Sequence, residues 1–196
     1  MPRRLYFISH PNVVISRDVP VPQWPLSALG RARMKAALAQ PWISDISAIY
    51  CSTEQKSIDG AEIIAAHLDL DIQPVHELGE NDRSATGFLS PDEFEAVANE
   101  FFAKPNQSVH GWETAAAAQA RIVKAVSKIA ASESSAGAIA LVSHGAVGTL
   151  LYCALAGRPI SRSWDQPPTN GGNYYAFQLS PERVFSWWKS IDDGAL

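Results

Sequence analysis

The sequence predicts a three-layer α/β domain in which helices cover both faces of a mostly parallel sheet. Hydrophobic runs at residues 5–8, 46–50 and 139–142 are rich in β-branched and aromatic side chains and lack polar alternation. Such runs are typical of strands buried on both faces. Helical patterns separate them, and this alternation predicts right-handed crossovers around a parallel sheet.

The first three helices have readable ends. Residues 27–40 carry small and apolar side chains on one face and stop before Pro41, while residues 53–68 form an apolar stripe with helical spacing. Ser90, Pro91 and Glu93 predict a helix start with a capping box, and this helix is expected to run to Phe102.

The second half of the chain continues the alternation and then changes character. Residues 114–132 and 147–154 predict two further helices, the second ending near Gly157. Near the C-terminus, residues 173–179 and 183–188 are strand-like and flank a short turn. They predict a late hairpin or edge pair.

Composition fits one domain over residues 1–196. The chain is 46% hydrophobic and 18% charged, and a chain of this length builds a full core without disulfides or structural metal. The net charge of −4 argues against nucleic acid and anionic membranes as partners. Cys51 and Cys153 are far apart in the sequence and no run is long enough to span a bilayer, so we expect a cytoplasmic protein. Oligomeric state is not predicted.

Two of the predicted strands end in the same dipeptide, Ser9-His10 and Ser143-His144. A single histidine at such a position is more often a structural hydrogen-bonding residue. Two of them on adjacent strands, however, would meet in one crevice at the carboxyl edge of the sheet, where α/β proteins bind ligands. His144 also lies at the start of a predicted helix, where free N–H groups favour an anion.

Four segments resemble, in order, the motifs of the histidine phosphatase superfamily, also called the phosphoglycerate mutase-like family. That family has Arg-His-Gly after the first strand, Pro-Leu-Thr-x-x-Gly before the first helix, Ser-x-Leu-x-Arg-Ala before the second helix and Ser-His-Gly after a late strand. The corresponding segments here are Ser9-His10-Pro11, Pro25-Leu26-Ser27-Ala28-Leu29-Gly30, Ser52-Thr53-Glu54-Gln55-Lys56-Ser57 and Ser143-His144-Gly145. The resemblance covers most of the chain.

The resemblance implies a phosphomonoester hydrolase acting on a small phosphorylated metabolite or a phosphoprotein. His10 would attack phosphorus as a neutral imidazole to form a phosphohistidine that water then hydrolyses. His144 would donate a hydrogen bond to the phosphoryl oxygens. The family's acid follows the third strand, where Glu80 is the first candidate, ahead of Asp82 and Glu77.

The sequence departs from the family pattern at the expected phosphate pocket. Ser9 stands where the family has an arginine, and Lys56 replaces a second arginine, so planar bidentate contacts are lost. We expect a less cationic pocket to which Ser9, Lys56, Asn12, Arg17 and Arg83 contribute phosphate contacts. These losses leave open a second interpretation, a domain of weak or no activity that binds a phosphorylated ligand or a protein partner.

Other chemistries lack their usual signatures. The sequence contains no nucleotide-binding glycine motif, and the five histidines show no metal-ligand spacing. We therefore predict no cofactor and no metal. Residues 163–174, rich in proline and glycine, are expected to form a long mobile loop that could face the substrate.

Overall fold

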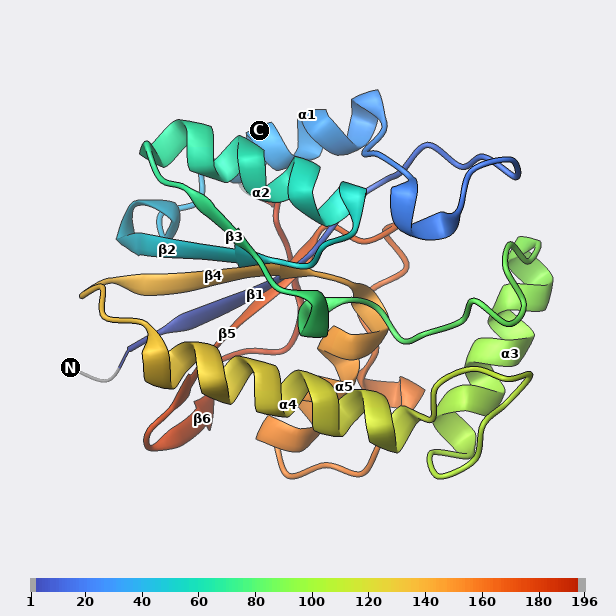
Figure 1. Cartoon of the computed structure of the whole chain (residues 1–196). Helices are drawn as coiled ribbons and strands as arrows, with labels where there is room; N and C mark the ends of the chain where they lie inside the picture. Colours follow the sequence, from blue (N-terminus) through green and yellow to red (C-terminus); the bar gives the residue numbers. More distant parts are fainter. Residues whose placement is uncertain (1–2, 194–196) are drawn as a thin grey trace.

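The computed structural model describes residues 3–193, in which a seven-stranded mixed sheet separates two layers of helices (Figure 1). The strands lie in the order β3-β2-β4-β1-β5-β6, and β7 also pairs with β5. The parallel strands are β1 (Leu5–Ser9), β2 (Ile46–Cys51), β3 (Ile72–Pro74) and β4 (Ala138–Ser143). The antiparallel strands are β5 (Asn173–Leu179), β6 (Glu182–Val184) and β7 (Lys189–Ser190). The predicted fold class is confirmed.

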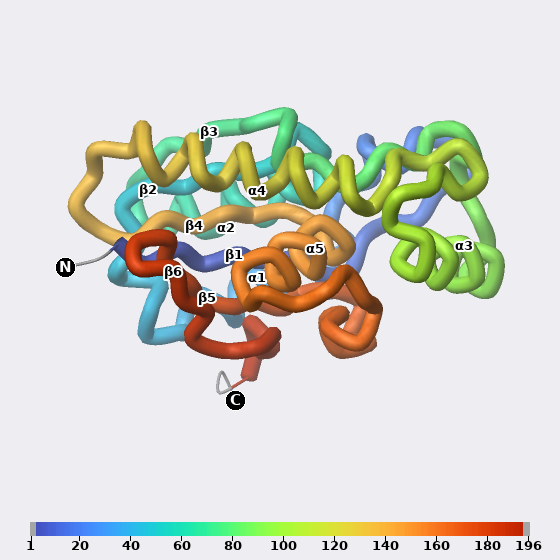
Figure 2. The backbone as a smooth tube through the Cα atoms, turned by 90° about the horizontal axis from the view of Figure 1, so that it is seen from below, coloured from blue at the N-terminus to red at the C-terminus, as the bar shows by residue number. Residues whose placement is uncertain are grey.

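Helices cover the sheet from both sides, as the sequence predicts. One face carries α1 (Ala28–Ala37) and α2 (Gln55–Leu68), and the other carries α4 (Ala115–Ser132) and α5 (Gly145–Leu155) (Figure 1). The remaining helix, α3 (Pro91–Ala103), lies at the end of the molecule away from the N-terminus (Figure 2). Its predicted capping box between Ser90 and Glu93 is present.

Two separate cores explain why the central strands lack polar alternation. In β1, Leu5 and Phe7 pack towards α4 and α5, whereas Tyr6 and Ile8 pack towards α1 and α2. All four side chains are at most 3% exposed. Because both faces of the strand are buried, neither favours a polar residue.

The C-terminal hairpin differs from its prediction in one arm. The strand expected at residues 183–188 is shorter than predicted, since β6 ends at Val184 and the next strand, β7, begins only at Lys189. Between them Trp188 turns into the core and packs edge-on against Tyr175 at a centroid distance of 4.7 Å. The residue that the pattern placed at the end of a strand is therefore part of the core.

The parallel register sets the position of the two histidines. Ser9 of β1 pairs with Ser143 of β4, so His10 and His144 follow the same rung of the sheet on neighbouring strands. On the other side of β4, Cys51 pairs with Val142, which places Ser52 at the same carboxyl edge.

Within residues 3–193, none of the helices combines the length and the apolar character needed to cross a bilayer.

Candidate active site

His10 and His144 lie together at the carboxyl edge of the sheet, and we call them the histidine pair. Their ring centroids are 5.1 Å apart with an interplanar angle of 72°. The backbone N–H of His10 donates to the carbonyl oxygen of Ser143 at 3.0 Å, which ties the two strand ends together. The two rings therefore lie close together at this edge of the sheet, as expected for histidines at the ends of neighbouring strands.

The surroundings of His10 define its protonation. Its Nδ1 lies 2.9 Å from the carbonyl oxygen of Pro11, and because a carbonyl only accepts, Nδ1 carries the proton. Nε2 is then left with its lone pair. Burial, reinforced by the Lys56 ammonium, lowers the pKa of His10 from 6.5 to about 4. The ring is therefore neutral at pH 7.

His144 is completely buried at the N-cap of α5. Its Nε2 lies 2.7 Å from Ser52 Oγ and 3.3 Å from Glu54 Oε1. Burial lowers the pKa of this ring well below its usual value, although Glu54 opposes the shift. Its Nδ1 is buried and has no hydrogen-bond partner among residues 3–193.

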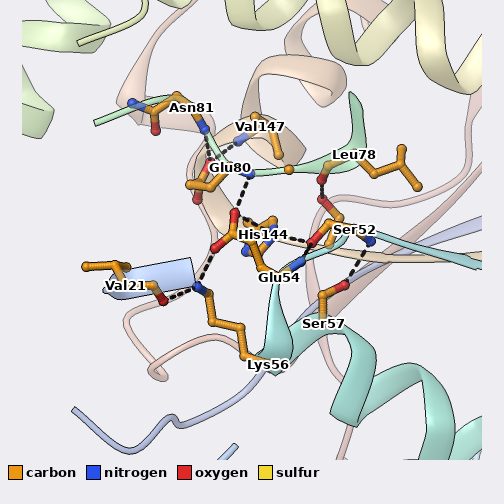
Figure 3. Close-up of polar contacts among 12 residues, drawn as sticks. Val21, Ser52, Glu54, Lys56, Ser57, Leu78, Glu80, Asn81, His144 and Val147 are labelled. Atoms are coloured by element: carbon orange, nitrogen blue, oxygen red, sulfur yellow. Dashed lines mark hydrogen bonds and ion pairs between the residues drawn. The ribbon is translucent and has the colours of Figure 1, made fainter. Parts of the chain in front are cut away.

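Glu54, the N-cap residue of α2, occupies the centre of the polar contacts (Figure 3). One of its oxygens binds the Lys56 ammonium, and the other accepts from the backbone N–H of Glu80 at 3.0 Å as well as facing His144. Burial alone would raise the pKa of Glu54, but the charge and hydrogen bond of Lys56 and the backbone N–H of Glu80 outweigh burial and lower the pKa to about 2. Glu54 is therefore a carboxylate at neutral pH.

Lys56, the predicted substitute for a phosphate-binding arginine, is turned towards protein groups. Only 2% of the residue is exposed, and Nζ binds Glu54 and the carbonyl oxygen of Val21, the latter at 2.9 Å. Burial lowers the pKa of Lys56, and the charge of Glu54 counteracts that shift. The positive charge of Lys56 already has an anionic partner inside the protein.

Glu80 binds the start of the helix that His144 caps. Its carboxylate accepts from the backbone N–H groups of Ala146 and Val147, at 3.2 and 3.1 Å. The sequence predicts that N–H groups at this helix start favour a bound anion, and in the structure the Glu80 carboxylate accepts from them. Burial raises the pKa of Glu80, while Arg83 opposes the shift. We call Glu54, Glu80 and Lys56 the carboxylate cluster.

A cavity of about 1000 Å³ opens beside the carboxylate cluster. Glu54 and Glu80 line it, together with Arg17 and Arg83. The guanidinium of Arg17 lies 5.2 Å from the Phe88 ring centroid, and that of Arg83 lies 4.9 Å from the Phe94 centroid. Both arginines among the predicted phosphate contacts therefore border this cavity. Neither His10 nor His144 lines this cavity, but Glu54, which does line it, contacts His144.

The other two acid candidates have exposed side chains. Asp82 is exposed, and its side chain accepts from the backbone N–H of Ser84 at 2.9 Å, which lowers its pKa. Glu77 is also exposed, and its backbone carbonyl binds Arg121. Of the three candidates, Glu80 is the one whose carboxyl group contacts the His144 helix and whose pKa is raised.

Ser9 and Asn12, the remaining predicted phosphate contacts, bind protein groups and do not line the cavity. Ser9 Oγ donates to Gln166 Oε1 at 2.6 Å and accepts from the backbone N–H of Asn173 at 3.0 Å. Asn12 Oδ1 accepts from Arg33 at 3.1 Å. Ser9 thus fastens the 163–174 segment beside His10, and this segment does not border the cavity either.

Three residues that contact groups of the site have no predicted role. Ser52 and Glu54 contact His144, and Arg121 holds the Glu80 loop through the carbonyl oxygens of Glu77, Gly79 and Glu80. One signal for Glu54 was present, because it stands at the leucine position of the Ser-x-Leu-x-Arg-Ala motif. Arg121 carries no such signal, since it lies in the middle of a long helix.

No group of three or more His, Cys, Asp or Glu side chains in the described part of the chain is arranged to hold a metal ion. The residues of the site supply two neutral imidazoles, two carboxyl groups and a paired ammonium. A neutral imidazole with a free Nε2 is a nucleophile, and a carboxyl group of raised pKa is a proton donor.

Solved structures with the same fold are numerous. A mycobacterial glucosyl-3-phosphoglycerate phosphatase with inorganic phosphate superposes with a TM-score of 0.78 at 20% identity, over 97% of this chain and 99% of that one. Bacillus stearothermophilus YhfR gives 0.72 at 21% identity over 93% and 94%. The alpha-ribazole phosphatase of Shigella flexneri gives 0.65 at 17% identity over 92% and 93%.

At these identities the structural similarity shows the fold alone. No curated protein sequence matches the chain. The family model of the histidine phosphatase superfamily (branch 1), however, matches residues 7–184. With this match over most of its length, and with the histidine pair at the ends of β1 and β4, the chain belongs to the histidine phosphatase superfamily.

Proposed function

We propose that this protein is a phosphomonoester hydrolase that works through a phosphohistidine on His10. The observation that carries the proposal is the contact between His10 Nδ1 and the Pro11 carbonyl, which leaves Nε2 unprotonated beside His144. In the first step the Nε2 lone pair forms a bond to phosphorus, and the bond from phosphorus to the leaving oxygen breaks.

Glu80 is the proposed source of the proton that the leaving oxygen takes up. Burial raises its pKa, which favours the protonated form that a proton donor requires. In the second step water attacks phosphorus, the bond between nitrogen and phosphorus breaks, and Glu80 takes the proton of the water. The products are an alcohol and inorganic phosphate, and His10 returns to its starting state.

His144 is the proposed hydrogen-bond donor to the phosphoryl group. Its buried Nδ1 has no partner among the described residues, and as an N–H it would donate to a phosphoryl oxygen while Ser52 Oγ donates to Nε2. Arg83 and Arg17, on the cavity wall, would contact the remainder of the substrate.

The substrate class follows from the cavity and from the structural relatives. Two of those relatives are phosphatases of small molecules, glucosyl-3-phosphoglycerate and alpha-ribazole phosphate by their names. A cavity of about 1000 Å³ has room for a small phosphorylated metabolite, and a phosphorylated side chain of a protein remains the other candidate. We keep a cytoplasmic location as part of the proposal, because Cys51 and Cys153 are both buried free thiols.

A second candidate function rests on the pairing of Lys56 with Glu54. Because Ser9 replaces one arginine and Lys56 is neutralised, the cationic contacts that phosphoryl transfer requires are reduced. The protein would then bind a phosphorylated ligand or a protein partner with weak or no turnover.

A labelling experiment separates the two candidates. Wild-type protein incubated with 4-nitrophenyl phosphate is expected to release nitrophenol and to carry acid-labile phosphate, whereas His10→Ala loses both, with activity reduced about 10³-fold or more. His67→Ala, an exposed histidine on α2, is the matched control and retains both. Equal turnover in His10→Ala contradicts the mechanism, and wild-type binding without turnover favours the second candidate.

A further inference from the structure

The anion-binding donors of this site are already used by carboxylates of the protein. The Glu54 carboxylate binds the Lys56 ammonium and accepts a hydrogen bond from the backbone N–H of Glu80. Its Oε1 lies 3.3 Å from His144 Nε2. The Glu80 carboxylate accepts hydrogen bonds from two backbone N–H groups at the start of α5. A phosphoryl group approaching the histidine pair meets these donors together with the negative charges that they neutralise.

The position of Glu54 makes its charge effective. Only 13% of its side chain is exposed, and Lys56 and His144 are at most 2% exposed, so solvent screens these groups little. The low pKa of Glu54 keeps the carboxylate ionised at neutral pH. A negative charge fixed beside the anion site disfavours each further negative charge on a ligand.

We propose that Glu54 selects the charge of the ligand, so that the site prefers phosphoryl groups with one negative charge over dianions. The inference rests on the proposed function and names the substrate form of its site, phosphate monoesters that are singly protonated and so carry one negative charge. Glu54 rejects dianions by repulsion, and it also competes with them for Lys56 and the Glu80 N–H. Removal of the charge should therefore improve dianion binding more than monoanion binding.

Two tetrahedral anions of fixed charge provide the test. Sulfate carries two negative charges at neutral pH and methanesulfonate carries one, so titration calorimetry at pH 7 gives the ratio of their affinities without any turnover. The wild-type protein is expected to bind sulfate no more tightly than methanesulfonate. Glu54→Gln is expected to shift that ratio towards sulfate by about tenfold or more, since one nearby charge at a poorly screened site accounts for at least that factor.

Asp18→Asn is the matched control, because Asp18 lines the same cavity and is exposed. It removes the same charge without touching Lys56 or His144, and the affinity ratio should change less than about threefold. Circular dichroism verifies that each variant is folded. If Glu54→Gln fails to fold, Glu54→Leu, with the residue type of the family motif, removes the same charge.

The outcomes are decisive for the inference and independent of the phosphohistidine. A ratio unchanged by folded Glu54 variants, loss of both anions in those variants, or no binding of either anion to any variant overturns charge selection. Binding of sulfate by Glu54→Gln alone supports it. Failure of the His10 labelling experiment would overturn the proposed catalysis and leave this binding result standing.

Discussion

The histidine pair and the carboxylate cluster occupy adjacent parts of one site, yet they are built differently. His10 and His144 follow paired positions on neighbouring strands, and burial keeps both rings neutral. Glu54 and Glu80 come from a helix start and a loop, and both carboxyl groups bind donors that face the same crevice. The histidines are placed by the sheet, whereas the carboxylates are placed by side-chain contacts.

This difference teaches that the reactive groups and the anion-binding groups of one site can diverge separately. In the proposed mechanism the histidine pair supplies the nucleophile and a hydrogen bond to the phosphoryl group. Among the neighbouring groups, a serine and an internally paired lysine stand where the family motifs have arginines. Substitutions that perturb either the histidine pair or the carboxylate cluster separate their contributions.

The largest expected effect is on the support of His10. Gly171 has a φ of +75°, and a Cβ placed there would lie 2.0 Å from the His10 carbonyl oxygen. Gly171→Ala should therefore lower the free energy of unfolding by about 3–5 kcal/mol, measured by urea denaturation. Gly87→Ala is the control, because Gly87 also has a positive φ but nothing lies within 4 Å, and it should cost only about 1 kcal/mol. Equal losses would show that His10 tolerates movement of this segment.

The next effect concerns the support of Glu80. Arg121 donates to three loop carbonyls and to both oxygens of Glu113, and only 23% of its side chain is exposed. Arg121→Lys keeps the charge but not the planar fork, so the free energy of unfolding should fall by about 2–3 kcal/mol. The pair of Arg162 with Glu95 supplies the control, because the Glu95 side chain is 57% exposed and Arg162→Lys should cost less than about 1 kcal/mol. An unchanged free energy of unfolding in Arg121→Lys would show that the Glu80 loop does not depend on the Arg121 guanidinium.

A smaller effect follows from the depressed pKa of Glu54. Its pKa is about 2 in the folded protein against 4.5 ordinarily, so the unfolded chain takes up a proton first as pH falls. The stability that Glu54 contributes is complete above about pH 5 and is lost between there and pH 2. The advantage of wild type over Glu54→Gln in free energy of unfolding should shrink by about 2 kcal/mol from pH 6 to pH 3. A pH-independent difference would mean that the Glu54 charge has no favourable partner.

The smallest effect measures how the two parts influence each other. The pKa of His10, about 4, is lowered by burial and Lys56 and raised by Glu54. Lys56→Met should therefore raise the pKa of His10 and Glu54→Gln should lower it, each by less than about one pH unit. NMR titration of the His10 ring, assigned with His10→Gln, measures both shifts. Shifts in the reverse directions would show that the carboxylate cluster does not act on His10 through charge.

Much of the fold was predictable because its signals are local. Hydrophobic runs without polar alternation identified β1, β2 and β4, and the capping residues Ser90 and Glu93 marked the start of α3. The gap between β6 and β7 was not predictable from the sequence. It contains Trp188, whose ring packs against Tyr175, and that contact forms only when the sheet and α5 have packed together.

The sequence by itself determined the alternation of strands and helices and the two Ser-His dipeptides that become the histidine pair. Each depends on periodicity or on the order of residues along the chain. Only the tertiary structure decided what Ser9, Lys56 and Glu54 bind. Ser9 and Gln166 are 157 residues apart in the chain, and Ser52 and His144 are 92 apart. The direction of a buried polar side chain is decided by the partners that satisfy it, and those partners meet only when the chain has folded.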